Sequence, residues 1–212
     1  MEKYALIVAG GSGSRMNSAR PKQFLELDGK PILVHTLEKF LLVESIKVVL
    51  VLPRDHFGDW EKIKSDYFAS EELIIVAGGE TRTASVLAGL NAIEDDGLVA
   101  IHDAVRPFVR VDTIERCFQS ALEFGSGVAA VELKDSIRKK VGSGDSEFRD
   151  RSDYVLVQTP QVFQISRIKE AYEKVSGTFS DDATVFEMAG NKVMLVESHY
   201  SNIKITTPED LK

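Results

Sequence analysis

The sequence alternates between short, nearly continuous apolar runs and segments in which apolar residues recur at helical spacing. The apolar runs are typical of strands buried on both faces of a sheet, and they cover residues 4–9, 46–52, 73–76, 98–101 and 128–131. Helical patterns lie between them at residues 32–43 and 81–93, and from a capping box formed by Asp112 and Glu115 to Phe124. This order predicts an α/β fold with a Rossmann-like, mostly parallel sheet and helices on both faces.

Residues 134–151 break this alternation, because they are charged and have no helical periodicity. They form either a mobile surface loop or a projecting β-hairpin arm that turns near Gly142 and Gly144, and we favour the arm. Strand patterns return at residues 154–157, 193–197 and 203–206, and helical patterns at 165–175 and 181–189. There is no internal repeat or linker, so we expect a single domain over residues 1–212 with an inserted arm at about 134–152.

Charge and composition limit the partners and the compartment. The 212 residues carry 26 Lys+Arg against 33 Asp+Glu, a net charge of −7, which argues against non-specific nucleic-acid binding but not against a local basic pocket. No apolar run approaches the roughly 20 residues of a membrane span, and the N-terminus has no cleavage site of a signal peptide. We therefore expect a cytoplasmic protein. The one cysteine, Cys117, lies in an apolar helical pattern and is interpreted as a buried core thiol.

A glycine-rich loop at residues 9–16 follows the first strand, and its glycines allow backbone N–H groups to approach an anion. It is not a dinucleotide fingerprint, because Met16 takes the place of the closing glycine, and no glycine is followed by the Lys-Ser or Lys-Thr of a Walker A loop. Arg15 and Lys22 add two cations, which suits a triphosphate at the ligand-binding edge of a parallel sheet. The alternative is an ordinary turn with solvated basic residues.

Residues 9–16, 21–24 and 29–33 resemble the nucleotide site of the sugar nucleotidyltransferase superfamily. Further motifs follow in the same order as in one family, 2-C-methyl-D-erythritol 4-phosphate cytidylyltransferase, and the resemblance runs from about residue 6 to 211. These motifs are residues 78–79, Arg82, 85–90, 102–107, 158–161, 202–205 and 208–211. The resemblance implies a nucleotidyltransferase domain that transfers CMP from CTP to 2-C-methyl-D-erythritol 4-phosphate, with Mg²⁺ as the divalent cation. The products would be 4-diphosphocytidyl-2-C-methyl-D-erythritol and pyrophosphate, in non-mevalonate isoprenoid precursor synthesis.

The resemblance also implies roles for individual residues. Arg15 and Lys22 would stabilise the transition state. Nucleotide-binding positions would be Ala9, Gly10, Gly11, Gly13, Gly79, Ser85 and Asp103. Substrate-binding positions would be Asp103, Ala104, Arg106, Ser136, Arg151, Thr159 and Lys204, with Ser136 standing where the family usually has threonine.

Several of these positions also allow plainer interpretations. Asp103 could be a turn cap, and whether it meets Mg²⁺ directly or through water is open. Ser85 could be an ordinary helical serine, and Lys204 could point to solvent from a strand. His102 is interpreted as a packed histidine at the end of a strand, because a phosphate nucleophile needs no general base.

In the resembled family the arm joins two copies in a homodimer, and Arg151 would reach the neighbouring site, although the sequence leaves open whether it acts in its own subunit. The nearest alternative function is a cytidylyltransferase for another polyol phosphate, such as ribitol 5-phosphate. A non-catalytic nucleotide-binding regulator is the alternative of another class, and the cations Arg15, Lys22 and Lys204 argue against it.

Overall fold

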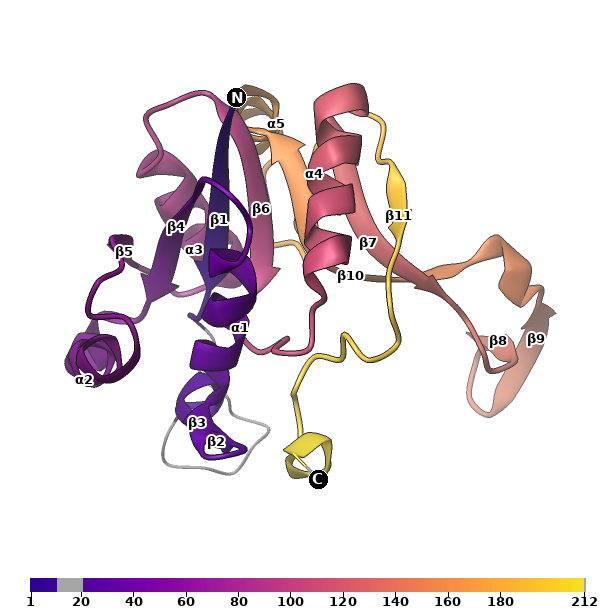
Figure 1. Ribbon diagram of the computed structural model, residues 1–212. Helices are drawn as coiled ribbons and strands as arrows, with labels where there is room; N and C mark the ends of the chain where they lie inside the picture. Colours follow the sequence, from indigo (N-terminus) through magenta and orange to yellow (C-terminus); the bar gives the residue numbers. More distant parts are fainter. Residues whose placement is uncertain (11–20, 212) are drawn as a thin grey trace.

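The protein is built around a seven-stranded sheet, seen in the computed structural model, which describes residues 1–10 and 21–211 (Figure 1). Its strands, in spatial order, are β11 (Leu195–Glu197), β7 (Ser126–Glu132), β10 (Val155–Gln164), β6 (Gly97–Asp103), β1 (Glu2–Val8), β4 (Ile46–Leu52) and β5 (Leu73–Ala77). Neighbouring strands are parallel except for β10, which runs antiparallel to both β6 and β7. The mostly parallel sheet is confirmed.

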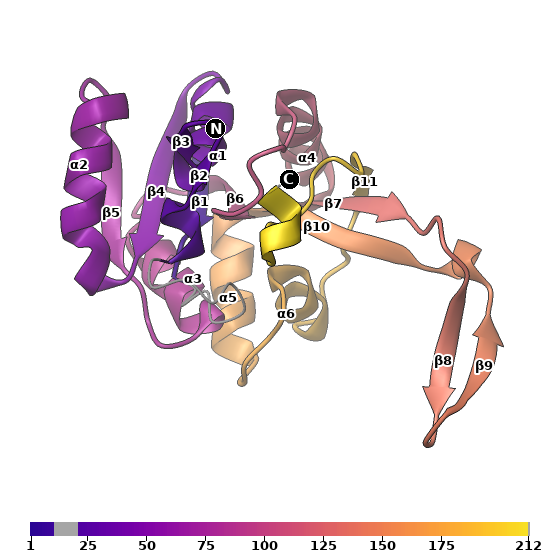
Figure 2. The ribbon, with the colours of Figure 1, turned by 90° about the horizontal axis from the view of Figure 1, so that it is seen from below.

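Helices cover both faces of this sheet (Figure 2). One face carries α1 (Ile32–Leu41), α2 (Phe57–Tyr67) and α4 (Val111–Phe124), and the other carries α3 (Arg82–Asn91), α5 (Ile165–Lys174) and α6 (Asp182–Met188). Along β1, Ala5 and Ile7 pack in the first of these two cores, whereas Leu6 and Val8 pack in the second. A strand buried on both sides needs an apolar residue at every position, which explains the continuous run in the sequence.

The arm is a two-stranded hairpin that projects from the sheet (Figures 1 and 2). Strands β8 (Ile137–Val141) and β9 (Asp145–Arg149) are antiparallel, and Gly142 and Gly144 in the turn have φ of 70° and 90°. These left-handed backbone angles favour glycine. Because the two strands pair on either side of this turn, the prediction of a hairpin arm is confirmed, and the alternative of a loop is not. At the root of the arm, the Lys134 ammonium lies 3.5 Å from the centre of the Tyr200 ring.

Two local predictions are wrong. Residues 203–206 form no strand, because their polar groups bond to loops instead of a neighbouring strand. The proposed capping box is not a cap either: the N-cap of α4 is Arg110, two residues before Asp112, and Asp112 pairs with the Arg110 and Arg116 side chains.

The sequence patterns also missed several elements. Helix α2 was missed because only Trp60 and Ile63 of its residues are buried. The short hairpin of β2 (Glu26–Leu27) and β3 (Lys30–Pro31) was missed as well, although Asp28 and Gly29 form its turn. Four short 3-10 helices complete the described chain: η2 (Lys22–Phe24), η3 (Arg54–His56), η4 (Arg151–Asp153) and η5 (Pro208–Leu211).

Cys117 of α4 is fully buried, as expected for a core thiol, and burial raises its pKa to about 12. None of the helices in residues 1–10 and 21–211 has the length and apolar character needed to cross a membrane.

Candidate active site

A cavity of about 220 Å³ lies beyond the carboxyl end of β6, at the edge of the sheet where open α/β folds bind ligands. The last residue of β6 is Asp103, which follows directly from the hydrophobic run of that strand. The turn after β6, the middle of β10, the start of α6 and the segment after β11 all contribute to the wall. The lining residues are Arg82, Asp103, Arg106, Val157, Gln158, Thr159, Gln161, Ser180, Asp181 and Lys204.

Three cations converge on the Asp103 carboxylate. Its Oδ2 lies 2.8 Å from Lys204 Nζ and 3.7 Å from Arg106 Nε. Its Oδ1 lies 3.4 Å from Arg82 Nε. The Lys204 side chain therefore points into the cavity and not away from the protein. Arg106 is only three residues from Asp103, but Arg82 and Lys204 come from distant parts of the chain, so the tertiary fold completes this cluster.

The ionisation of Asp103 follows from the balance of two effects. Burial by itself disfavours the charged carboxylate, but the charges of Arg82, Lys204 and Arg106 outweigh it and hold the pKa well below its usual range. The neighbouring His102 is neutral instead of charged, since burial lowers its pKa to about 3. At neutral pH the site thus holds a carboxylate and a neutral imidazole, and His102 packs 4.8 Å from the Phe40 ring, as expected of a core histidine.

Arg82 is fixed by a second carboxylate. Its Nη1 and Nη2 donate to the two oxygens of Asp182, at 3.1 and 2.7 Å, and the Tyr172 hydroxyl donates to Asp182 Oδ1 at 2.5 Å. Asp182 is fully buried, and this fork-to-fork pairing is the geometry that a guanidinium favours. Arg82 belongs to the motifs that carry the family resemblance, but the sequence assigns it no role. No pattern in the sequence indicates that Asp182 is its partner.

Hydrogen bonds of Thr159 and Ala104 hold the backbone at Asp103 in place. Thr159 is buried in a bulge of β10, and its Oγ1 accepts from the Asp103 N–H at 3.1 Å. The Ala104 N–H donates to Val8 O at 3.1 Å, and its carbonyl accepts from Thr36 Oγ1 at 2.8 Å. The end of β6 is therefore held from both sides.

The start of the glycine loop lies against Ser85, the buried serine of α3. Ser85 Oγ accepts from the Gly79 N–H at 3.2 Å and donates to the Gly79 carbonyl at 3.3 Å. A Cβ on Gly10 would lie 2.8 Å from the same Oγ, so a larger residue would require the Ser85 hydroxyl to move. Ala9 is buried, and its carbonyl accepts from Gln23 Nε2 at 2.6 Å. Gly10, Gly79 and Ser85, which come from two loops and a helix, thus lie together, and Ala9 directly precedes Gly10.

A family model for 2-C-methyl-D-erythritol 4-phosphate cytidylyltransferase matches residues 4–212. The chain belongs to this family. Proteins of that name from Bacteroides thetaiotaomicron and Bacteroides fragilis are 44% and 46% identical to it, over 100% of this chain and 97% of each relative. A crystal structure of 4-diphosphocytidyl-2C-methyl-D-erythritol synthase from Anaerococcus prevotii superimposes with a TM-score of 0.87 and 30% identity, covering 99% of this chain and 92% of that one.

Membership in the cytidylyltransferase family makes the chain a nucleotidyltransferase of isoprenoid precursor synthesis that uses CTP. Gly11, Gly13 and Arg15 lie outside the described residues, so the structure says nothing of their positions. Lys22 is half-buried at the start of η2.

Three of the expected substrate-binding residues do not line the cavity: Ala104, which directly follows Asp103, and the two arm residues. Ser136 and Arg151 are exposed at the root of the arm, and neither is among the residues that line it. The Arg151 guanidinium donates to the Lys134 carbonyl instead. Within one copy of the chain, the structure brings Asp103, Arg106, Thr159 and Lys204 together but leaves the arm residues apart.

The side chains present limit how a divalent cation could bind. Within the described ranges, no group of three or more His, Cys, Asp or Glu side chains could hold a metal ion. Asp181 also lines the cavity, but its oxygens already accept from Thr184 and Gln161. Mg²⁺ commonly takes one or two protein carboxylates, several waters and substrate phosphates. The Asp103 oxygens also have partners, in Lys204 and Arg82, so the donor set fits a Mg²⁺ ion only where one carboxylate is joined by waters and substrate phosphates.

Proposed function

We propose that this chain transfers CMP from CTP to 2-C-methyl-D-erythritol 4-phosphate, and that the Asp103 cavity binds the alcohol phosphate. The observation that carries this assignment is the cluster of Lys204, Arg106 and Arg82 around one carboxylate, at the edge of the sheet next to the Gly79–Ser85 contact. A dianionic phosphate could be held by Lys204 and Arg106, while Asp103 accepts hydrogen bonds from the hydroxyls of the polyol.

The chemistry needs no general base. A non-bridging oxygen of the alcohol phosphate, already ionised near neutral pH, attacks the α-phosphorus of CTP and forms a new P–O bond. The bond from that phosphorus to the β-phosphate oxygen breaks, and pyrophosphate leaves with its electron pair. The barrier is mainly the approach of two polyanions and the charge that develops at phosphorus, which fixed cations offset. Arg15 and Lys22 are the proposed cations at the α-phosphate.

We also infer that Mg²⁺ takes part, with Asp103 as its protein ligand, either directly or through water. When bound, it would neutralise part of the triphosphate charge. Ser85 and Gly79 would then hold the cytosine, since a site that hydrogen-bonds one base edge rejects another base by leaving its own polar groups unpaired.

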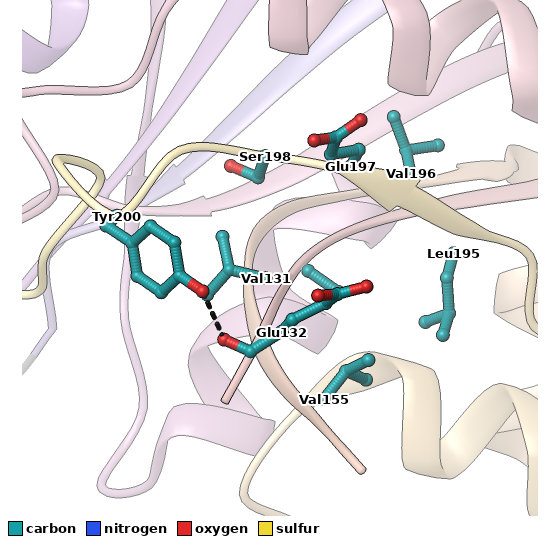
Figure 3. A pocket seen from close by; sticks show the side chains of 9 residues that line it. Val131, Glu132, Val155, Leu195, Val196, Glu197, Ser198 and Tyr200 are labelled. Atoms are coloured by element: carbon teal, nitrogen blue, oxygen red, sulfur yellow. Dashed lines mark hydrogen bonds between the residues drawn. The ribbon is translucent and has the colours of Figure 1, made fainter. Parts of the chain in front are cut away.

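Exposed apolar residues support a homodimer formed through the arm. Phe148 on β9 is 71% exposed and Leu156 on β10 is 52% exposed, and an isolated hairpin is marginal in water without a surface to pack on. A second cavity, of about 330 Å³, lies at the sheet edge formed by β7, β11 and the start of β10 (Figure 3). Its lining residues are Ala130, Val131, Glu132, Val155, Leu195, Val196, Glu197, Ser198 and Tyr200. A partner copy that covers this surface would bring its own arm, with Ser136 and Arg151, toward the neighbouring site.

Two experiments test the proposal. The first measures release of pyrophosphate from CTP with 2-C-methyl-D-erythritol 4-phosphate and Mg²⁺. Parallel reactions replace CTP by UTP, or the alcohol phosphate by ribitol 5-phosphate. Turnover that prefers ribitol 5-phosphate would overturn the substrate assignment, and binding of CTP without pyrophosphate release would make the chain a regulator.

The second experiment mixes two inactive variants, Arg15→Ala and Arg151→Ala. If Arg151 acts across the interface, mixed dimers regain one intact site, and activity recovers to about a quarter of wild type, since about half of the dimers are mixed. No recovery despite proven subunit exchange would place Arg151 in the site of its own subunit. We expect the enzyme to be cytoplasmic and to bind neither nucleic acid nor membranes.

A further inference from the structure

Lys204 lies in a segment without regular secondary structure, so something other than a sheet must hold it at Asp103. Residues 198–206 follow the short edge strand β11, and no strand pairs with residues 203–206. A lysine side chain has four rotatable carbons, and its placement depends on how firmly its backbone is held. On one side of Lys204, Ile205 is fully buried and its N–H donates to Val105 O at 2.9 Å.

On the other side, Asn202 bonds to two further segments of the site. Its Nδ2 donates to Gln158 Oε1 at 2.9 Å and to Thr159 O at 2.8 Å, both in the bulge of β10. Its backbone carbonyl accepts from Arg106 Nη1 at 2.8 Å. Asn202 is only 1% exposed, which is unusual for an asparagine outside regular secondary structure.

The partner of Asn202 in the bulge is itself held by other bonds. Gln158 Oε1 also accepts from Ser198 Oγ at 2.8 Å, and Gln158 Nε2 donates to His199 O at 3.3 Å. The bulge of β10 and the segment that carries Lys204 are therefore joined by four side-chain hydrogen bonds, which Gln158 and Asn202 share. Pocket walls built from separate loops need such cross-links if their side chains are to keep a fixed geometry.

We infer that Asn202 is a positioning residue, which assembles the phosphate-binding side of the site by joining the segments that carry Arg106, Thr159 and Lys204. It acts through these neighbours and does not itself need to touch the substrate. The inference rests on the proposed function, because it assumes that Lys204 and Arg106 bind the alcohol phosphate. The feature that distinguishes it from an ordinary buried asparagine is that three of its hydrogen bonds end on residues that line the cavity, Gln158, Thr159 and Arg106.

A double-mutant cycle tests this role. The kcat/KM for 2-C-methyl-D-erythritol 4-phosphate is measured for wild type, Asn202→Ala, Lys204→Met and the double variant. Misplacing a binding group by about 1 Å can cost up to roughly 100-fold, so we expect Asn202→Ala to lose about 10- to 100-fold while KM for CTP changes less than about twofold. In the Lys204→Met background, the further loss should be much smaller, because the group that Asn202 positions is already gone.

Asn191→Ala is the matched control, since Asn191 makes side-chain hydrogen bonds to Arg167 and Phe186, neither of which lines the cavity. It should lower the melting temperature without the selective loss for the alcohol phosphate. The inference is overturned if the losses of Asn202→Ala and Lys204→Met multiply, if CTP suffers equally, or if Asn191→Ala behaves in the same way.

A crystal structure of Asn202→Ala gives a readout that is independent of turnover. We expect Lys204 Nζ to leave Asp103 Oδ2, beyond the roughly 4 Å limit of an ion pair. An unchanged Lys204 position would refute the positioning role even if the wild-type enzyme used another polyol phosphate. A wild-type protein without turnover, but with this displacement in the variant, would instead reject the proposed function alone.

Discussion

Replacing Asp103 by asparagine removes the negative charge at the centre of the site and leaves its shape almost unchanged. Lys204 and Arg106 then lose the carboxylate that lies within 4 Å of both, whereas Arg82 keeps its pair with Asp182. Removing one partner of a fully buried ion pair costs about 3–5 kcal/mol. The Asp103 side chain is 10% exposed but that of Lys204 is 36% exposed, so solvent screens part of the effect. We expect a loss of about 2–3 kcal/mol in the free energy of unfolding.

The assay is urea denaturation at pH 7, with Asp112→Asn as the control. Asp112 also lies within 4 Å of two cations, Arg110 and Arg116, but its side chain is 48% exposed. Its replacement should cost at most about 1 kcal/mol. If Asp103→Asn destabilises the protein no more than Asp112→Asn does, the account of a buried, charge-coupled site is refuted.

The effect of Asp103→Asn should also depend on pH in a defined direction. The folded-state pKa of Asp103 lies below the unfolded value of about 3.9, so its contribution to stability is present above that pH and is lost as the pH falls below it. The difference between wild type and Asp103→Asn should be constant from pH 7 to about 5 and shrink below about pH 4. A difference that grew on acidification would contradict the assigned charge state. Turnover should be badly impaired at all pH values.

Three further outcomes are expected. Arg15→Ala and Lys22→Ala should each lower turnover by about 10²–10³-fold with little change in melting temperature, and near-normal rates would remove that residue from the mechanism. Gly125→Ala should destabilise the fold in thermal denaturation, because Gly125 has φ of 92° and a Cβ there would lie 1.9 Å from Arg167 Nη1; unchanged stability would mean that the turn relaxes freely. Cys117 should react with a thiol reagent only as fast as the protein unfolds, since it is buried and its pKa is raised to about 12, and rapid labelling of the native protein would contradict that burial.

The strands of the sheet were predictable because burial on both faces imposes apolar residues at every position, as Leu6 and Ile7 of β1 illustrate. Helix α2 was not, because it buries so few of its residues against the sheet that charged positions obscure the period. The apolar run around Lys204 predicts a strand, but hydrogen bonds to Val105 and to the bulge of β10 take the place of a sheet partner.

The candidate site was predictable only as a set of residue types and motifs. Asp103 and Lys204 are 101 positions apart, and the Arg82–Asp182 pair joins α3 to α6 across a similar separation. No periodicity in the sequence encodes such contacts, since they arise when separate elements pack on the same edge of the sheet. For the same reason, the role of Asn202 became visible only when its bonding partners were found on two segments of the cavity wall, the bulge of β10 and the turn after β6.

The most direct test of the central claim is the position of the alcohol phosphate in a crystal structure of the enzyme with 2-C-methyl-D-erythritol 4-phosphate. We predict phosphate oxygens within hydrogen-bonding distance, about 2.7–3.2 Å, of Lys204 Nζ and an Arg106 nitrogen, with a polyol hydroxyl donating to Asp103. A well-ordered ligand at another site, with the ion pair between Lys204 and Asp103 undisturbed, would contradict the assignment of this cavity.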